Sequence, residues 1–359
     1  MNDSQFIPSY SGLSAQSGST RWQAPSNIAL VKYWGKKEVQ IPMNPSISFT
    51  LSECRTETQL DFRPKAEGVD WIGVELDGEA QPGFVPKIET FFARIERYLP
   101  FLKDHSFRIR THNTFPHSSG IASSASGMGA LAACLVAMEE QLSGLAYAAD
   151  ARIKKISFLA RLGSGSACRS MQGPLVVWGE HPSIANSSDL FGVRFEGIIH
   201  PAFDNYRDTI LLVDVGEKQV SSTAGHGLMH GHPFAEARFA EANKHLGQLP
   251  EVLEKGDLDR FIEIVELEAL QLHAMMLTSS PYFILMKPNT LAIINAIWDY
   301  RKQSGSKLCF TLDAGANVHL LYPDAEASAV QAFIADVLAA YCKNGAYIHD
   351  RCGEGVSAF

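Results

Sequence analysis

The chain has 359 residues, of which 46% are hydrophobic and 19% charged, values typical of a globular protein large enough to bury a substantial core. A formal net charge of −8 argues against a nucleic-acid-binding protein with a broad basic surface, although a few lysines and arginines can still gather around an anionic small molecule. No apolar stretch reaches the roughly 18 residues of a membrane span, and the six cysteines lack metal-binding spacing. We therefore expect a cytoplasmic protein with reduced thiols that binds neither membranes nor nucleic acids.

The first half of the chain predicts a β-rich region followed by helices. Residues 1–20 are polar and rich in Ser and Gly, which predicts a flexible or loosely docked extension. A short buried strand at 27–37 ends in a basic, aromatic loop. Further strands are predicted at 46–51, 56–62, 71–76, 107–111 and 173–179, helices at 85–99, 128–142 and 147–161, and a hairpin turn at Asp77-Gly78.

The second half is mostly helical. A buried strand is predicted at 209–215, helices at 233–246, 248–254, 257–275, 288–303 and 325–342, and two strands at 307–312 and 319–322 around a Gly-rich turn. We place an approximate boundary between the two parts of the chain near residue 205. Because no repeat or linker separates the two halves, we expect them to share one cleft.

The segment 116–127 is rich in small and hydroxyl residues and opens directly into an alanine-rich helix. Such a junction leaves backbone N–H groups unpaired at the positive end of the helix dipole. Gly and Ala allow a phosphate to approach the backbone, and Ser123 and Ser124 add hydroxyl donors. A Ser-rich N-cap of a buried helix explains the segment equally well when it is considered alone. The pattern is neither GxxxxGK[ST] nor GxGxxG, so any phosphate loop here is of another type.

Three further segments combine small, hydroxyl and charged residues: 32–36 (KYWGK), 163–170 (GSGSACRS) and 313–315 (DAG). Each has an ordinary structural explanation as a surface loop or turn. Together with the Ser-rich loop, and in this order, they resemble the diphosphomevalonate decarboxylases of the GHMP kinase superfamily. The resemblance extends from about Ala24 to the C-terminus, and other kinases of the superfamily do not carry KYWGK or GSGSACRS in this form.

The resemblance implies an α+β fold of the two-layer GHMP kinase type. A ribosomal-protein-S5-like, ATP-binding part is expected at 21–205 and a ferredoxin-like part at 206–359, around one cleft. The family is commonly dimeric, so a homodimer is expected.

The resemblance also implies ATP-dependent decarboxylation of mevalonate 5-diphosphate to isopentenyl diphosphate, ADP, phosphate and CO₂ in isoprenoid biosynthesis. A tertiary alcohol is a poor nucleophile, and Asp313 matches the general base that would take its proton. Lys32 would supply a fixed cation near Asp313 and the transferring phosphoryl group. Arg169 offers a planar fork suited to the carboxylate that is lost.

The other implied contacts fall into two sets. ATP requires Mg²⁺, which would bridge phosphate oxygens. No protein metal site is expected, because His226, His230 and His232 lack an accompanying Cys or carboxylate framework. The substrate positions are Tyr33, Lys36, Ser164, Ser166, Arg169 and Ser222, and the ATP positions are Ser119, Gly120, Ala122, Ser123 and Ser124.

Other functions remain open at this point. Related enzymes accept mevalonate 5-phosphate, and departures from the usual family letters at Glu38, Pro45 and Ala316 bear on the choice of substrate. A mevalonate kinase that stops at phosphorylation does not need Arg169 beside the GSGS segment. A non-catalytic ligand-binding relative would be expected to lose Lys32 or Asp313, and both are present.

Overall fold

The computed structural model describes residues 3–10, 13, 15–66, 72–116, 121–216 and 222–359. None of the helices within these ranges is long and apolar enough to cross a membrane. The helices are α1 (Val85–Ile95), α2 (Ser123–Ser143), α3 (Ala149–Gly163), α4 (Ser222–Gly227), α5 (Ala235–Lys255), α6 (Leu258–Leu277), α7 (Pro288–Ser304) and α8 (Ala327–Asp336). The strands are β1 (Gly18–Val31), β2 (Ser46–Pro64), β3 (Ile72–Leu76), β4 (Glu79–Ala80), β5 (His105–Asn113), β6 (Leu175–Trp178), β7 (Val193–Arg194), β8 (Arg207–Leu211), β9 (Cys309–Thr311), β10 (Val318–Tyr322), β11 (Tyr347–Arg351) and β12 (Ser357–Ala358).

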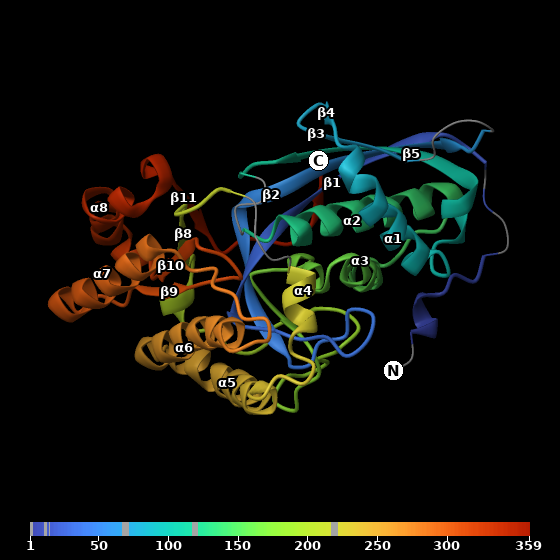
Figure 1. Cartoon of the computed structure of the whole chain (residues 1–359). Helices are drawn as coiled ribbons and strands as arrows, with labels where there is room; N and C mark the ends of the chain where they lie inside the picture. The colour runs from blue at the N-terminus through green and yellow to red at the C-terminus, as the bar shows by residue number, and fades with distance from the viewer. Residues whose placement is uncertain (1–2, 11–12, 14, 67–71, 117–120, 217–221) are drawn as a thin grey trace.

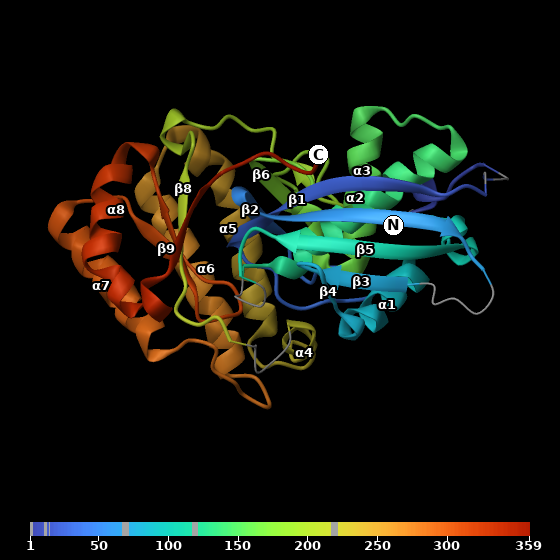
Figure 2. The ribbon, with the colours of Figure 1, turned by 90° about the horizontal axis from the view of Figure 1, so that it is seen from above.

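A large sheet carries the first part of the chain. Its strand order is β12-β1-β2-β5-β3-β4, with β6 paired to β2 and β7 paired to β6. Helices α1, α2 and α3 lie on one face of this sheet (Figures 1 and 2). The apolar side chains of α2 are buried there, because an alanine-rich helix can approach a sheet closely.

A smaller sheet, ordered β11-β8-β10-β9, carries the second part together with helices α5 to α8 (Figure 1). One hydrophobic cluster joins the two parts, since it contains Ile28 of β1, Phe49 of β2, Ile210 of β8 and Ile264 of α6. The expected α+β class is confirmed. The chain passes from one sheet to the other between β7 and β8, yet β12 returns to pair with β1, so the division at residue 205 stays a prediction.

Strand β2 is continuous where the sequence predicts two strands at 46–51 and 56–62. The N–H groups in its middle point to a partner from far along the chain: the Asp350 carboxylate accepts hydrogen bonds from Ser52, Glu53 and Cys54 at 2.8, 2.9 and 2.7 Å. Buried backbone donors must be paired, and Asp350 pairs them where the neighbouring strands change.

Two helix predictions also differ from the structure. The two helices predicted at 233–246 and 248–254 form one helix, α5, which continues through Pro250 because buried leucines on both sides of the proline hold it. The helix predicted at 325–342 ends earlier, because Val337 leaves the helical region with φ −125°. Strands β11 and β12 follow, and the sequence analysis did not predict either of them.

The N-terminal segment is docked more specifically than its composition predicts. Phe6 is 5% exposed, and its ring stacks on Phe158 with centroids 4.0 Å apart. Asp3 accepts a hydrogen bond from Arg97 at 3.0 Å, and the Tyr10 hydroxyl donates to Glu139 at 2.9 Å. The buried ring of Phe6 therefore holds residues 3–10 in place despite their polar composition.

We expect Phe6→Ala to lower the free energy of unfolding by about 3 kcal/mol, since it removes a buried aromatic ring. Ile7→Ala is the matched control, because Ile7 is 44% exposed. Chemical denaturation of both variants measures the difference. Equal stabilities would mean that Phe6 is not anchored in solution.

Candidate active site

Lys32 and Asp313 form an ion pair at the junction of the two sheets. Lys32 follows β1 and Asp313 lies just beyond β9, with 3.2 Å between Lys32 Nζ and Asp313 Oδ1. The Lys32 side chain is 2% exposed and that of Asp313 is 29% exposed. Burial lowers the pKa of Lys32, and the adjacent Asp313 carboxylate opposes that shift. The structure thus brings together two of the three predicted catalytic residues, which are 281 residues apart in the sequence.

Arg169, the third predicted catalytic residue, is a buried cation beside this pair. It belongs to the 3₁₀ turn Gly165–Ser170 and is 3% exposed. Its Nη1 donates to Ser46 at 2.8 Å, its Nε donates to Ser48, and its guanidinium lies 5.8 Å from the ring centroid of Tyr33. No ion pair within the described residues involves Arg169. A buried, unpaired guanidinium is costly, so the arrangement favours an anionic ligand.

Tyr33 packs into an aromatic stack that also contains a residue the sequence analysis did not assign to the site. The His226 ring lies 4.4 Å from both Tyr33 and Trp34, and its Nδ1 accepts a hydrogen bond from the Gly35 N–H at 2.9 Å. Burial, followed by the charges of Lys36 and Arg169, lowers the pKa of His226 well below its ordinary value, which agrees with a neutral ring that accepts at Nδ1. The sequence around His226 carries no signal of this contact.

A second cationic group lies at the other end of the basic loop. Burial, together with the charges of Arg94 and Lys87, lowers the pKa of Lys36 to about 8. The sequence analysis named Lys36 but missed Lys87 and Arg94. Their spacing of seven residues places both on one face of a helix, and this pattern could have indicated them.

The Ser-rich loop enters α2 through a constrained residue. Ala122 has φ +44°, a left-handed conformation that non-glycine residues seldom adopt and that often occurs at functional sites. Within the described residues no side chain caps α2, and the Ala125 N–H donates to the Ala122 carbonyl at 2.7 Å, so the N–H groups of Ser123 and Ser124 are the ones that could face an anion. The Ser124 hydroxyl lies 3.4 Å from that of Ser164, which connects this loop to the GSGS turn.

A cavity of about 240 Å³ adjoins Ser123 and Ser124. Strands β2, β3 and β5 line one side of it, and α1 and α2 line the other. Its walls are mostly apolar, with Thr111, Asn113 and Lys87 among the polar residues. No pattern in the sequence predicts this cavity.

Three predicted positions are described only in part or not at all. Ser119 and Gly120 lie outside the described residues, and Ser222 begins α4 without a described side chain. Ser166 lies in the same turn as Arg169, and its backbone carbonyl accepts a hydrogen bond from Asn27 at 3.2 Å.

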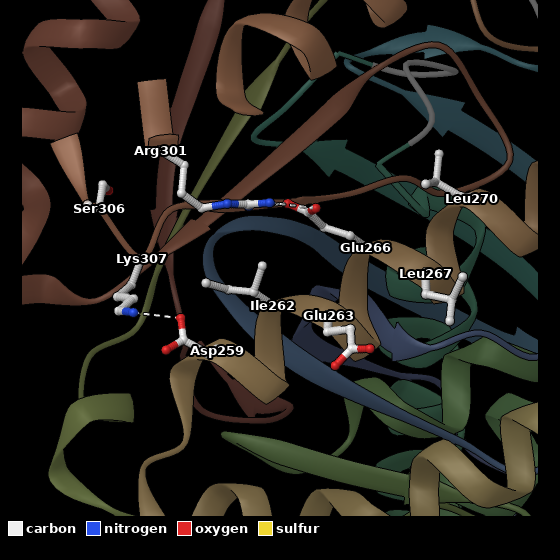
Figure 3. A pocket seen from close by; sticks show the side chains of 10 residues that line it. Asp259, Ile262, Glu263, Glu266, Leu267, Leu270, Arg301, Ser306 and Lys307 are labelled. Atoms are coloured by element: carbon white, nitrogen blue, oxygen red, sulfur yellow. Dashed lines mark hydrogen bonds and ion pairs between the residues drawn. The ribbon is translucent and has the colours of Figure 1, made fainter. Parts of the chain in front are cut away.

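A second, larger groove of about 580 Å³ runs along α6 and the end of α7 (Figure 3). Four of its charged groups are paired with one another, Glu266 with Arg301 at 2.6 Å and Asp259 with Lys307 at 2.5 Å, and Glu263 pairs with Arg260 of the same helix. It does not include Lys32, Asp313 or Arg169. The described residues also contain no group of three or more His, Cys, Asp or Glu side chains arranged to hold a metal ion.

Comparisons with known proteins agree with this geometry. Residues 24–189 match the family described as the diphosphomevalonate decarboxylase-like N-terminal domain, and residues 209–355 match the mevalonate 5-diphosphate decarboxylase C-terminal domain. A diphosphomevalonate decarboxylase of Ganoderma lucidum is 31% identical over 321 residues, which cover 84% of this chain and 77% of the relative. A phosphomevalonate decarboxylase of Haloferax volcanii is 28% identical over 313 residues, which cover 86% of this chain and 89% of the relative.

Solved structures give the same result. Mevalonate diphosphate decarboxylase from Staphylococcus aureus superposes with a TM-score of 0.81 at 28% identity, covering 96% of this chain and 98% of that one. A structure described as MDDEF in complex with MVAPP, AMPPCP and magnesium superposes with a TM-score of 0.80 at 30% identity, covering 96% and 99%. The expected GHMP kinase-type fold is confirmed, and the chain belongs to the diphosphomevalonate decarboxylase family.

Proposed function

We propose that this chain catalyses the ATP-dependent decarboxylation of mevalonate 5-diphosphate to isopentenyl diphosphate, with Lys32, Asp313 and Arg169 as its catalytic residues. The observation that carries the proposal is a buried guanidinium, that of Arg169, beside the ion pair of buried Lys32 with the partly exposed Asp313. A kinase that only transfers phosphate needs a base and a cation. A decarboxylase must in addition hold the carboxylate that it expels, and Arg169 suits that requirement.

Asp313 is the proposed general base. Its carboxylate accepts the proton of the tertiary 3-hydroxyl while the hydroxyl oxygen attacks the γ-phosphorus of ATP and ADP leaves. As a cation beside Asp313, Lys32 would favour the ionised carboxylate and stabilise negative charge on the transferring phosphoryl group.

Arg169 acts in the second step. Ser46 and Ser48 accept hydrogen bonds from Nη1 and Nε of its guanidinium, which has five N–H donors in all. The remaining donors can orient the substrate carboxylate. The C3–O bond then breaks and phosphate leaves, the bond to the carboxylate carbon breaks, and its electron pair forms the double bond as CO₂ departs.

The cavity between α1, α2 and the large sheet is the proposed site of the ATP adenosine. It adjoins Ser123 and Ser124, so a base in the cavity would direct its phosphates toward the start of α2. Mg²⁺ binds mainly through substrate phosphates in such sites, and it would neutralise their charge.

Lys36 supports a polyanionic substrate end, because burial and the nearby charges of Arg94 and Lys87 lower its pKa, and an anion beside Lys36 would offset both effects. This favours the diphosphate over the monophosphate. Mevalonate 5-phosphate remains the second candidate, since the Haloferax volcanii relative is a phosphomevalonate decarboxylase.

Three further predictions from the sequence accompany this function: a homodimer, a cytoplasmic location, and a division into two parts near residue 205. All six cysteines are free thiols in the structure, which supports a reducing compartment. Light scattering of the purified chain tests the homodimer.

The function is tested by measuring ADP, phosphate and CO₂ from purified protein supplied with Mg-ATP and either mevalonate 5-diphosphate or 5-phosphate. We expect all three products in equal amounts and a kcat/KM for the diphosphate at least about 10-fold higher, equivalent to ~1.4 kcal/mol. ADP without CO₂ would identify a kinase, and a preference for the monophosphate would identify a phosphomevalonate decarboxylase.

Asp313→Asn should lower kcat by roughly 10²- to 10⁴-fold, because the amide cannot accept the hydroxyl proton. ADP and CO₂ should fall together, since phosphorylation precedes decarboxylation. Asp259→Asn is the matched control: Asp259 also pairs with a lysine, but its side chain is 79% exposed and lies outside the site. An Asp313→Asn enzyme with near-normal kcat would rule out the general-base role.

The kcat/KM for the phosphorylated mevalonate should fall as the pH rises through about 8, because Lys36 then loses its charge in the free enzyme. Lys36→Arg keeps the positive charge at higher pH, so the basic limb of the kcat/KM profile should move to higher pH. Lys37→Arg, at an exposed neighbouring position, should leave the limb unchanged. If the limb stays in place in Lys36→Arg, another group controls it.

A further inference from the structure

Helix α6 holds both members of the Lys32–Asp313 pair through their backbones. The Glu268 carboxylate accepts a hydrogen bond from the Lys32 N–H at 2.8 Å. The His273 Nε2 lies 3.1 Å from the Asp313 carbonyl oxygen. A carbonyl can only accept, so this Nε2 carries the hydrogen and donates it. Both side chains are buried, Glu268 at 0% and His273 at 2% exposed.

Arg238 of α5 completes the contact on the Lys32 side. Its Nη1 donates to Glu268 at 3.0 Å, and its Nη2 donates to the Lys32 carbonyl at 3.1 Å. His245 Nδ1 donates to the same carboxylate at 2.6 Å. The Lys32 peptide groups are therefore held on both sides by one buried ion pair, in which charge-assisted hydrogen bonds are strong and directional.

The distance between Lys32 and Asp313 depends on an element that contacts both of their strands. Lys32 follows a strand of the large sheet and Asp313 follows a strand of the small sheet, and these strands share no hydrogen-bonded ladder. Helix α6 packs against both β1 and β9. Glu268 and His273 are five positions apart, about 7.5 Å along a rigid helix, so the helix fixes the position of the end of β1 relative to the end of β9.

We propose that Glu268 and His273 are positioning residues that hold the Lys32 ammonium and the Asp313 carboxylate at the separation required for catalysis. The proposal rests on the proposed function, in which Lys32 and Asp313 act as cation and base. Each acts through a peptide group of a catalytic residue: Glu268 through the Lys32 N–H and His273 through the Asp313 carbonyl.

The proposal predicts a change in pH dependence as well as in rate. The charged and titratable groups facing the pair are Arg169 from its turn, Arg238 from α5, Glu268 and His273 from α6, and Asp208 from β8. If Lys32 and Asp313 move apart, Asp313 loses part of the attraction that favours its ionised form. Its pKa then rises, and the acid limb of the kcat profile moves to higher pH.

The experiment compares His273→Leu, which removes the donor, with His273→Gln, whose side-chain amide can place an N–H near the lost Nε2. His273→Leu should lower kcat by about 10- to 100-fold with little change in either KM, and should move the acid limb upward. His273→Gln should recover part of the lost kcat and move the acid limb part of the way back to its wild-type pH. His181→Leu is the matched control, because His181 is also buried and its Nε2 lies 3.0 Å from a backbone carbonyl, that of Asn243, away from the pair.

His181→Leu should lose comparable stability but keep the wild-type kcat and acid limb. If His273→Leu behaves like this control, the positioning role is wrong although the wild-type enzyme still decarboxylates. If the wild type releases neither ADP nor CO₂, the proposed function itself fails.

If His273→Leu does not fold, Glu268→Gln gives the same readout, since it keeps an acceptor for Lys32 but loses the charge that orients Arg238. An unshifted acid limb with normal kcat in folded Glu268→Gln would also overturn the proposal.

Discussion

Burial of the Lys32 ammonium is the constraint on which the arrangement of the site depends. Removing a charge from water costs several kcal/mol unless a carboxylate and hydrogen bonds compensate for it. Asp313 supplies the carboxylate, and it comes from the other sheet, so the compensation exists only when the two sheets are packed together. The shared hydrophobic cluster of β1, β2, β8 and α6 stabilises that packing. Folding and assembly of the catalytic pair are thus the same event.

The site concentrates positive charge in a chain whose net charge is −8. Arg169 and Lys36 are both at least partly buried, and their pKa values are lowered mainly by loss of water. Such groups destabilise the empty site and are relieved by an anion. A substrate with a diphosphate at one end and a carboxylate at the other matches this distribution, and the phosphates of ATP add to it.

Aromatic packing gives the basic loop its shape. Tyr33 lies between Arg169 and His226, and Gly165 permits this approach, because a Cβ there would lie only 2.7 Å from the Tyr33 hydroxyl oxygen. His226 connects the loop to α4, the helix that begins at Ser222. The loop, the GSGS turn and α4 are therefore one packed unit, although they are far apart in the sequence.

The sequence predicted those features that depend on residues close together in the chain. The Asp77-Gly78 hairpin, helices α1 to α3 and the motifs around Lys32, Ser164 and Asp313 depend on residue types within a few positions, so pattern and propensity identified them. Continuity of β2 depends on Asp350, almost 300 residues away, and no local pattern contains that contact. The same holds for the neighbours of the catalytic pair, which are Arg238, His245, Glu268 and His273, and for His226. Only the tertiary structure decided these, because burial and charge pairing depend on which distant segments meet.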